Sequence, residues 1–176
     1  MNLQVITLGG GCFWCVEAVF ECVDGVVAVE SGYTNGHVID PSYAQVCAGN
    51  SGHAEVVRVS FDAQRISLAE ILEIFFGVHD PTTRDRQGND IGSQYRSGIY
   101  WHEAAQAEVA TAVRAEANAA WGGRVVTEIA PLSNYWRAED GHQHFFAQHP
   151  GQGYCAMVVA PKLAKFRKTF KARIKS

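Results

Sequence analysis

The sequence lacks any long uninterrupted run of apolar residues. None of the segments in its 176 residues is long and apolar enough to cross a bilayer. The chain enters a strand-like segment almost at once, with no basic stretch, apolar signal core or small-residue cleavage site before it. We therefore expect a cytoplasmic protein without a membrane partner.

An excess of positive charge is also absent, because 15 Lys and Arg residues face 18 Asp and Glu residues, for a net charge of -3. This balance argues against binding to nucleic acid. The basic residues are nevertheless concentrated at the C-terminus, where residues 162–176 contain no acidic side chain. Apolar residues recur there at near-helical spacing, which predicts an amphipathic helix over about residues 161–175 with its basic face in water.

Cysteines are few and odd in number. Five of them do not suggest the disulfide framework of a secreted protein. The hydrophobic content of 47% is enough for one sizeable core, so we expect a single domain over residues 1–176 and a monomer. Strand-like and helix-like segments are interleaved without linkers or repeats, which predicts a mixed layer of sheet and helices. The segment Tyr154–Val159 is predicted to be the last strand.

The most informative segment is Gly-Gly-Gly-Cys-Phe-Trp-Cys at residues 9–15. An apolar, strand-like stretch precedes it and a helix-like stretch follows it, so Cys12 falls at or just before the first helical turn. Free N–H groups and the helix dipole lower the pKa of a thiol at such a place. We therefore predict a reactive Cys12 with thiolate character, flanked by the rings of Phe13 and Trp14.

Three other interpretations of this segment stay open on local grounds. Cys12 could be an inert core residue. Cys12 and Cys15 could form the redox pair of a general dithiol-disulfide oxidoreductase, although no proline stands between them. They could also bind zinc in a non-enzymatic module together with His142 or His144, although those histidines lack the usual ligand spacing.

A carboxylate occurs in the segment 53–61, which has strand composition. If the strand begins by Glu55, alternation of side chains places this carboxylate on the more apolar face. Burial would then raise its pKa and suit it to act as a general acid near neutral pH. If the strand begins later, Glu55 is a solvated edge residue. The pattern alone leaves both interpretations open.

Six short motifs of the chain resemble the peptide methionine sulfoxide reductase A family. They are GCFW at 11–14, GHAE at 52–55, HDPT at 79–82, RQGND at 86–90, QYRS at 94–97 and AEDGHQ at 138–143. The resemblance runs in the family's order from residue 9 to about residue 170. It implies an α+β fold, a two-layer roll related to the ferredoxin-like arrangement, in which a mixed sheet packs with helices.

The resemblance also implies an activity. The family reduces the S-epimer of methionine sulfoxide, free or in proteins, and so repairs oxidised proteins without a metal or organic cofactor. Cys12 matches the nucleophile that becomes a sulfenic acid, and Glu55 matches the acid that protonates the departing oxygen. Phe13 and Trp14 match the aromatic wall that holds the methyl group of the substrate.

Further positions match polar residues of the family's site. Tyr43 and Tyr95 match hydroxyls that bind the sulfoxide oxygen, and Asp90 matches a residue that orders the site. The expected partners are methionine sulfoxide, as substrate, and a thioredoxin-like reductant. Without the resemblance, each of these three residues would be interpreted as an ordinary core tyrosine or turn aspartate.

The chain departs from the commonest family pattern at several points. Position 15 is Cys where many members have Gly, position 85 is Asp where many have Asn, and the tail lacks a Gly-rich extension with a further cysteine. Cys155 matches the usual resolving position, and Cys15 is its competitor. We expect Cys22 and Cys47 to be buried structural residues.

Overall fold

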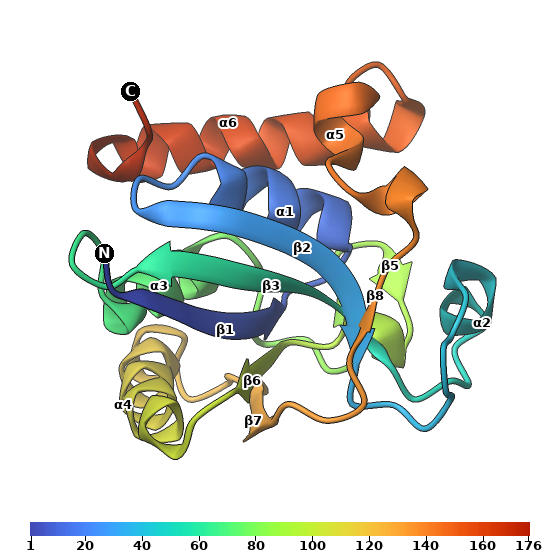
Figure 1. The fold of residues 1–176 in the computed structure, drawn as a ribbon, viewed down its shortest axis with the longest axis horizontal. Coiled ribbons are helices and arrows are strands. Elements are labelled where there is room, and N and C mark those ends of the chain that lie inside the picture. The colour runs from blue at the N-terminus through green and yellow to red at the C-terminus, as the bar shows by residue number, and fades with distance from the viewer.

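The computed structural model describes all 176 residues, and its elements are shown in Figure 1. The strands are β1 (Leu3–Gly9), β2 (Val26–Thr34), β3 (Ala54–Asp62), β4 (Arg86–Gln87), β5 (Asp90–Ile91), β6 (Gly98–Trp101), β7 (Glu128–Pro131) and β8 (Trp136–Arg137). The α-helices are α1 (Phe13–Glu21), α2 (Tyr43–Cys47), α3 (Leu68–Gly77), α4 (Ala104–Ala120), α5 (Phe145–Gln148) and α6 (Ala160–Thr169). Short 3-10 turns occupy Ser93–Tyr95, Asp140–His142 and Lys171–Arg173.

Six of the strands form one sheet in the order β7-β6-β1-β3-β2-β8. Neighbouring strands are antiparallel except for β6 and β7, which run parallel. The strands β4 and β5 form a separate small hairpin. The predicted α+β class, a mixed sheet packed with helices, is confirmed.

The core lies between one face of this sheet and the helices α1, α3 and α4. The two strands β1 and β3 contribute to this core because side chains alternate between the two faces of a sheet, so every second side chain of each strand points toward the helices. The fully buried residues of these two strands on that face are Ile6, Leu8, Val57, Val59 and Phe61. The opposite face carries polar side chains, among them Arg58, whose guanidinium lies 5.8 Å from the centre of the Tyr135 ring.

The prediction of a last strand at Tyr154–Val159 is wrong. The segment Cys155–Val159 is a π-helical turn that leads directly into α6. Its β-branched valines suggested a strand, but the buried residues of the whole segment follow one helical face at spacings of four, four and three. These residues are Cys155, Val159, Leu163 and Phe166.

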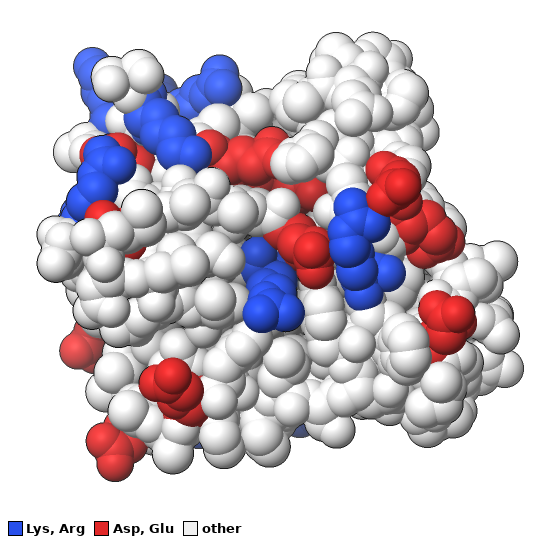
Figure 2. All heavy atoms as spheres, in the orientation of Figure 1, with Lys and Arg blue, Asp and Glu red and all other residues white.

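The C-terminal helix is also shorter than expected, because α6 ends at Thr169 rather than near residue 175. Beyond it, Ile174 makes an isolated antiparallel bridge to Val23 at the end of α1. The basic side chains of this segment gather at the end of the molecule where Figure 1 shows α6 and the C-terminus, as seen in Figure 2. None of the helices has both the length and the apolar character that crossing a membrane requires.

Candidate active site

The turn between β1 and α1 fixes the position of Cys12. Cys12 is the N-cap residue of α1, and Gly11 before it has φ +94, a conformation that side chains rarely adopt. A Cβ atom at Gly11 would lie 2.6 Å from the side chain of Gln87. Gln87 in turn accepts a hydrogen bond from the backbone N–H of Asp80 and donates one to its carbonyl, both at 2.9 Å. The loop over residues 80–87 is therefore held directly against the turn that presents Cys12.

Glu55 belongs to β3, and its carboxylate reaches the start of α1 directly after this turn. The strand β3 begins at Ala54, and Glu55 is only 1% exposed, so the buried interpretation of this carboxylate is the correct one. Its Oε1 accepts a hydrogen bond of 3.2 Å from the backbone N–H of Phe13, whereas its buried Oε2 has no hydrogen-bond partner. Burial raises the pKa of Glu55 to about 8, against the lowering effect of the Phe13 N–H. A carboxyl group in this state can hold a proton at neutral pH.

The predicted lowering of the Cys12 pKa is wrong in its net direction. Burial, followed by hydrogen bonding to Cys15 and by the charge of Glu55, raises the pKa of the Cys12 thiol above its usual value. The backbone N–H of Trp14 does lower it, as the helix terminus predicts, but this contribution is the smaller one. The pKa of Cys15 is lowered, first by its hydrogen bond with Cys12 and further by the charge of Lys162. The hydrogen bond between the two thiols therefore acts in opposite directions, raising the pKa of Cys12 and lowering that of Cys15.

An aromatic wall stands beside Cys12. Phe13 is fully buried as its floor, and the half-buried ring of Trp14 stacks on Phe145 with 3.8 Å between ring centres. The indole N–H of Trp14 donates a hydrogen bond of 3.2 Å to Nδ1 of His142. His142 stacks in turn on Tyr43, with 4.2 Å between ring centres. The wall thus joins three separate parts of the chain: α1, α2 and the segment that leads into α5.

Polar groups complete the site around this wall. The backbone N–H of Tyr43 donates to Glu139 at 2.9 Å. Tyr95 packs against the cluster that contains Cys12. Burial raises the pKa of both tyrosines, followed by the side-chain hydrogen bond with Cys47 at Tyr43 and by the charge of Glu55 at Tyr95, so both hydroxyls stay protonated at neutral pH. Asp90 accepts a hydrogen bond of 2.5 Å from the hydroxyl of Tyr154.

A second buried carboxylate holds the outer part of the wall in place. Glu17, on α1, is 1% exposed and accepts hydrogen bonds from the Ser31 hydroxyl at 2.9 Å and from the Phe145 N–H at 3.2 Å. Burial raises the pKa of Glu17. Gln143 binds the backbone N–H and carbonyl of the same Ser31. These contacts fasten residues 143–145 to α1 and β2.

Three of the five free cysteines share one buried cluster: Cys12, Cys15 and Cys155. The expectation that Cys22 and Cys47 are buried is wrong, because Cys22 is half-buried and Cys47 is exposed. The alternative zinc site, made of Cys12, Cys15 and His142 or His144, does not assemble. The one group of three potential ligands whose atoms lie within 4.8 Å of one another consists of Glu17, Glu21 and His144, and its His144 and Glu21 already form an ion pair.

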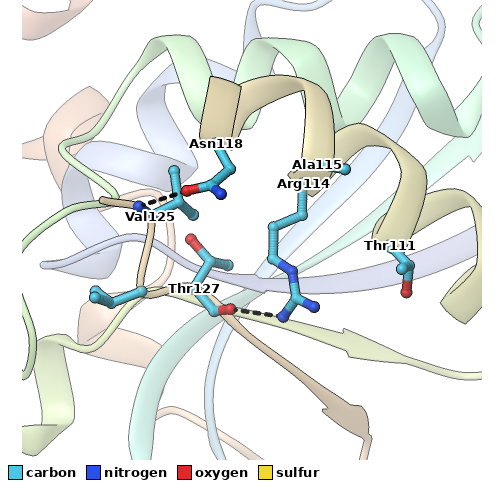
Figure 3. Close-up of a pocket in the computed structure, with 7 residues that line it drawn as sticks. Thr111, Arg114, Ala115, Asn118, Val125 and Thr127 are labelled. Carbon is cyan, nitrogen blue, oxygen red and sulfur yellow. Dashed lines mark hydrogen bonds between the residues drawn. The ribbon is translucent and has the colours of Figure 1, made fainter. Parts of the chain in front are cut away.

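A hollow of about 470 Å³ lies elsewhere, between α4 and the segment that leads into β7 (Figure 3). Arg114 crosses it to donate a hydrogen bond of 3.1 Å to the carbonyl of Thr127, and Asn118 accepts one of 3.0 Å from the Val125 N–H. No cysteine, histidine or carboxylate lines it. This hollow therefore offers neither a thiol nor a carboxylic acid for the reduction of a sulfoxide.

The structure brings all the predicted site residues to one end of α1 and adds residues that the sequence analysis did not single out for this site. Phe145, Tyr154 and Glu139 supply a stacking ring, a hydroxyl and a carboxylate to it. The available signals were that Glu139 belongs to the AEDGHQ motif, that Phe145 follows this motif closely, and that Tyr154 directly precedes Cys155.

Known proteins share this architecture and sequence. A family model described as peptide methionine sulfoxide reductase matches residues 4–174. The chain is 52% identical over 180 residues to the peptide methionine sulfoxide reductase MsrA of Ralstonia nicotianae, covering 99% of this chain and 94% of that protein. The crystal structure of Mxr1 from Saccharomyces cerevisiae in reduced form has a TM-score of 0.82 and 35% identity, covering 88% of this chain and 90% of that one. Mxr1 in complex with Trx2 has a TM-score of 0.58 and 27% identity, covering 82% and 85%.

Proposed function

The chain belongs to the peptide methionine sulfoxide reductase A family and reduces methionine sulfoxide, and from this premise we propose how it does so. The substrate is the S-epimer, free or in proteins, and the purpose is repair of oxidised proteins. Cys12 is the nucleophile, Glu55 the acid, and a disulfide within the chain follows. Residues 1–176 act as one catalytic domain, as a cytoplasmic monomer without metal or organic cofactor.

In the first step, the Cys12 thiolate attacks the sulfoxide sulfur. The Cys12 thiol gives its proton to the ionised form of Cys15, which the hydrogen bond between the two residues favours by lowering the pKa of Cys15. Glu55 gives its proton to the sulfoxide oxygen, that oxygen passes to the Cys12 sulfur, and methionine leaves. The cysteine is then a sulfenic acid, the sulfoxide has been reduced by two electrons, and Glu55 is ionised.

The wall and the hydroxyls orient the substrate for this attack. Phe13 and Trp14 offer an apolar surface to the methyl group, and Tyr43 and Tyr95 donate hydrogen bonds to the sulfoxide oxygen. Asp90 orders the site through the hydroxyl of Tyr154. This arrangement points the oxygen toward Glu55, which lies below the turn.

In the second step, a thiol of the buried cluster condenses with the Cys12 sulfenic acid, forming a disulfide and releasing water. Cys155 is the resolving residue that the family match favours, and Cys15 is its competitor. A thioredoxin-like dithiol then reduces the disulfide by exchange. The solved complex of the related Mxr1 with Trx2 supports a reductant of this kind.

The observation that carries the proposal is the state of Glu55. It is buried, it is bonded on one side to the helix that Cys12 begins, and its other oxygen has no partner. The large majority of buried polar side-chain atoms in proteins have a hydrogen-bond partner, so the unpartnered Oε2 of Glu55 calls for an explanation. An acid awaiting a substrate oxygen has this arrangement before the substrate binds.

A stereospecific assay tests the proposal. Peptides that contain the S- or the R-sulfoxide are incubated with the protein and dithiothreitol, and methionine is quantified. We expect reduction of the S-epimer alone and none by Cys12→Ser, because a hydroxyl is a far weaker nucleophile than a thiolate. Appreciable reduction by Cys12→Ser, or equal use of both epimers, would contradict the assignment.

A further inference from the structure

A carboxylate at the edge of the site connects two parts of its wall. Glu139 is exposed, yet both of its side-chain oxygens accept a hydrogen bond. Its Oε1 accepts one of 2.9 Å from the Tyr33 hydroxyl, and its Oε2 accepts one of 2.9 Å from the backbone N–H of Tyr43. Partial burial acts to raise the pKa of Glu139, but the hydrogen bonds of the Tyr43 N–H, of its own backbone and of the Tyr33 hydroxyl hold that pKa below its ordinary value. Glu139 is therefore a bridge between Tyr33 and Tyr43.

One end of this bridge belongs to the sheet that carries Glu55. Tyr33 is fully buried in β2, and it lies opposite Glu55 of β3 in the strand register. Its ring packs beside that of Phe13, with 5.7 Å between ring centres. The backbone N–H of the same Phe13 donates to Glu55. The Tyr33 hydroxyl therefore has a fixed place relative to the proposed acid.

The other end of the bridge is α2, which has few other attachments. This helix has five residues, of which Val46 is the buried one, and Figure 1 shows it at one side of the molecule, apart from the other helices. Gln94 donates a long hydrogen bond of 3.5 Å to the carbonyl of Cys47, at the last residue of α2. At the first residue, the bond from the Tyr43 N–H to Glu139 joins α2 to a distant part of the chain.

The backbone that carries Glu139 is itself joined to the sheet. Ala138, the residue before it, is buried, and its N–H donates a hydrogen bond of 3.0 Å to the carbonyl of Ser31 in β2. Gln143 donates one of 3.0 Å to the carbonyl of Ala138. The bridge therefore extends from a fixed support toward a helix that lacks one.

The place of Tyr43 matters because of what its side chain does in the proposed function. Tyr43 and Glu55 act there on the same sulfoxide oxygen, Tyr43 as a hydrogen-bond donor and Glu55 as the acid. A hydrogen bond weakens steeply as its distance and angle depart from the optimum, and a misplacement of about 1 Å can cost about 100-fold in rate. Donor and acid must therefore keep one spacing, although they belong to different elements.

We infer that Glu139 is a positioning residue of the reaction, which joins the Tyr33 hydroxyl to the Tyr43 N–H and so holds the Tyr43 side chain in register with Glu55. This inference rests on the proposed function, because Glu139 acts through the hydroxyl of Tyr43. It requires no contact between Glu139 and the substrate.

A double-mutant cycle tests the inference. The reduced forms of wild type, Glu139→Ala, Tyr43→Phe and the double variant are mixed with a saturating peptide that contains the S-sulfoxide, and release of the first methionine is timed by rapid quench. We expect Glu139→Ala to slow this release by about tenfold, the effect of losing one hydrogen bond, and Tyr43→Phe to slow it at least as much. The double variant should stay within about twofold of Tyr43→Phe, because it has no Tyr43 hydroxyl left to position.

Two further variants separate positioning from loss of charge or of folding. Asp140→Asn is the matched control, because it removes the adjacent exposed carboxylate, which bonds to Arg137 rather than to α2, and it should keep the wild-type rate. Glu139→Gln should stay within about threefold of the wild-type rate. Its amide oxygen can accept from the Tyr43 N–H, while its amide nitrogen can donate to the hydroxyl oxygen of Tyr33.

Equal slowing by Glu139→Ala with and without the Tyr43 hydroxyl would overturn the inference, because the effect would not act through Tyr43. Release at the wild-type rate by Glu139→Ala or by Tyr43→Phe would also overturn it. If Glu139→Ala fails to fold, Glu139→Asp enters the same cycle, since it keeps the charge on a side chain that is one methylene shorter.

The wild type in the same experiment separates the two proposals. If the reduced wild type releases no methionine, the proposed function itself fails. If it releases methionine and Tyr43→Phe is slow while Glu139→Ala is not, the positioning role of Glu139 alone is wrong.

Discussion

Two glutamates of this protein have the same burial but different hydrogen-bond partners, and we propose different roles for them. Glu55 and Glu17 are each 1% exposed, and burial raises the pKa of both. Both oxygens of Glu17 accept a hydrogen bond, whereas Glu55 has one oxygen bonded and one without a partner. Burial alone therefore does not distinguish the proposed acid Glu55 from the structural carboxylate Glu17. The carboxylate oxygen of Glu55 that has no hydrogen-bond partner distinguishes them.

Replacing each carboxylate with its amide is the most direct test of whether Glu55 and Glu17 have different roles. We expect Glu55→Gln to slow the first release of methionine by about 100-fold or more, in line with the loss of a general acid. The amide keeps the bond from the Phe13 N–H and loses only the transferable proton. Rapid-quench measurement of methionine decides this, with Glu17→Gln as the control. A rate equal to wild type in Glu55→Gln would mean that its free oxygen has no chemical role.

The same variant should reveal the proton on Glu55 through stability. The pKa of Glu55 is about 8 in the folded protein, against an ordinary value of 4.5. Between these values the folded state holds one more proton than the unfolded state, so raising the pH favours unfolding. The stability that this proton contributes is complete below pH 4.5 and is lost as the pH rises through 8.

Urea titrations at pH 5, 6, 7 and 8 would measure this effect. We expect the unfolding free energy of wild type to fall more steeply with pH than that of Glu55→Gln, by up to about 1.4 kcal/mol per pH unit. In an additional titration above pH 9, the unfolding free energies of the two proteins should depend on pH with the same slope. Parallel curves for the two proteins would show that Glu55 is ionised throughout the range.

Glu17→Gln should give the opposite result, a loss of stability with little loss of rate. An amide has one acceptor oxygen where Glu17 serves two donors, so one buried donor is left unpaired. We expect the free energy of unfolding to fall by about 1–3 kcal/mol at pH 7. The first methionine should be released within about threefold of the wild-type rate. A rate loss comparable to that of Glu55→Gln would erase the distinction between the two carboxylates.

The smallest expected effect concerns the wall that Glu17 holds in place. Trp14→Ala removes the ring that stacks on Phe145 and should raise KM for a methyl sulfoxide by about tenfold, while discrimination against ethyl sulfoxides weakens. Steady-state kinetics with both substrates measures this. Unchanged constants for both substrates would assign Trp14 to packing alone.

Local sequence predicts the first half of the site well. Glycines between an apolar strand and a helix place Cys12 at the N-cap, and alternation along β3 leaves Glu55 with only two possible positions. Which of the two is correct depends on where β3 begins. Its pairing with β2, in which Tyr33 lies opposite Glu55, extends the strand to that residue, and no short-range pattern contains this information.

Other features of the site depend on contacts between residues far apart in the sequence, which local patterns do not reveal. The pKa of Cys12 is set by the burial of the whole turn, which outweighs the local effect of the helix terminus. The contacts of Trp14 with His142 cross 128 positions of the chain. The segment at Cys155 contains β-branched valines typical of strands, yet packing of its buried face against α1 makes it helical. In each case tertiary contacts override a local preference.

The fit between Gly11 and Gln87 also limits how such an enzyme can diversify. A side chain at position 11 would meet Gln87 and a backbone conformation unfavourable to it, so shortening Gln87 would remove only one of the two obstacles. Evolution and protein engineering therefore have almost no freedom on the loop side of the sulfur. Positions such as His142 and Phe145, which are held by hydrogen bonds and stacking, leave more room for changes in substrate range.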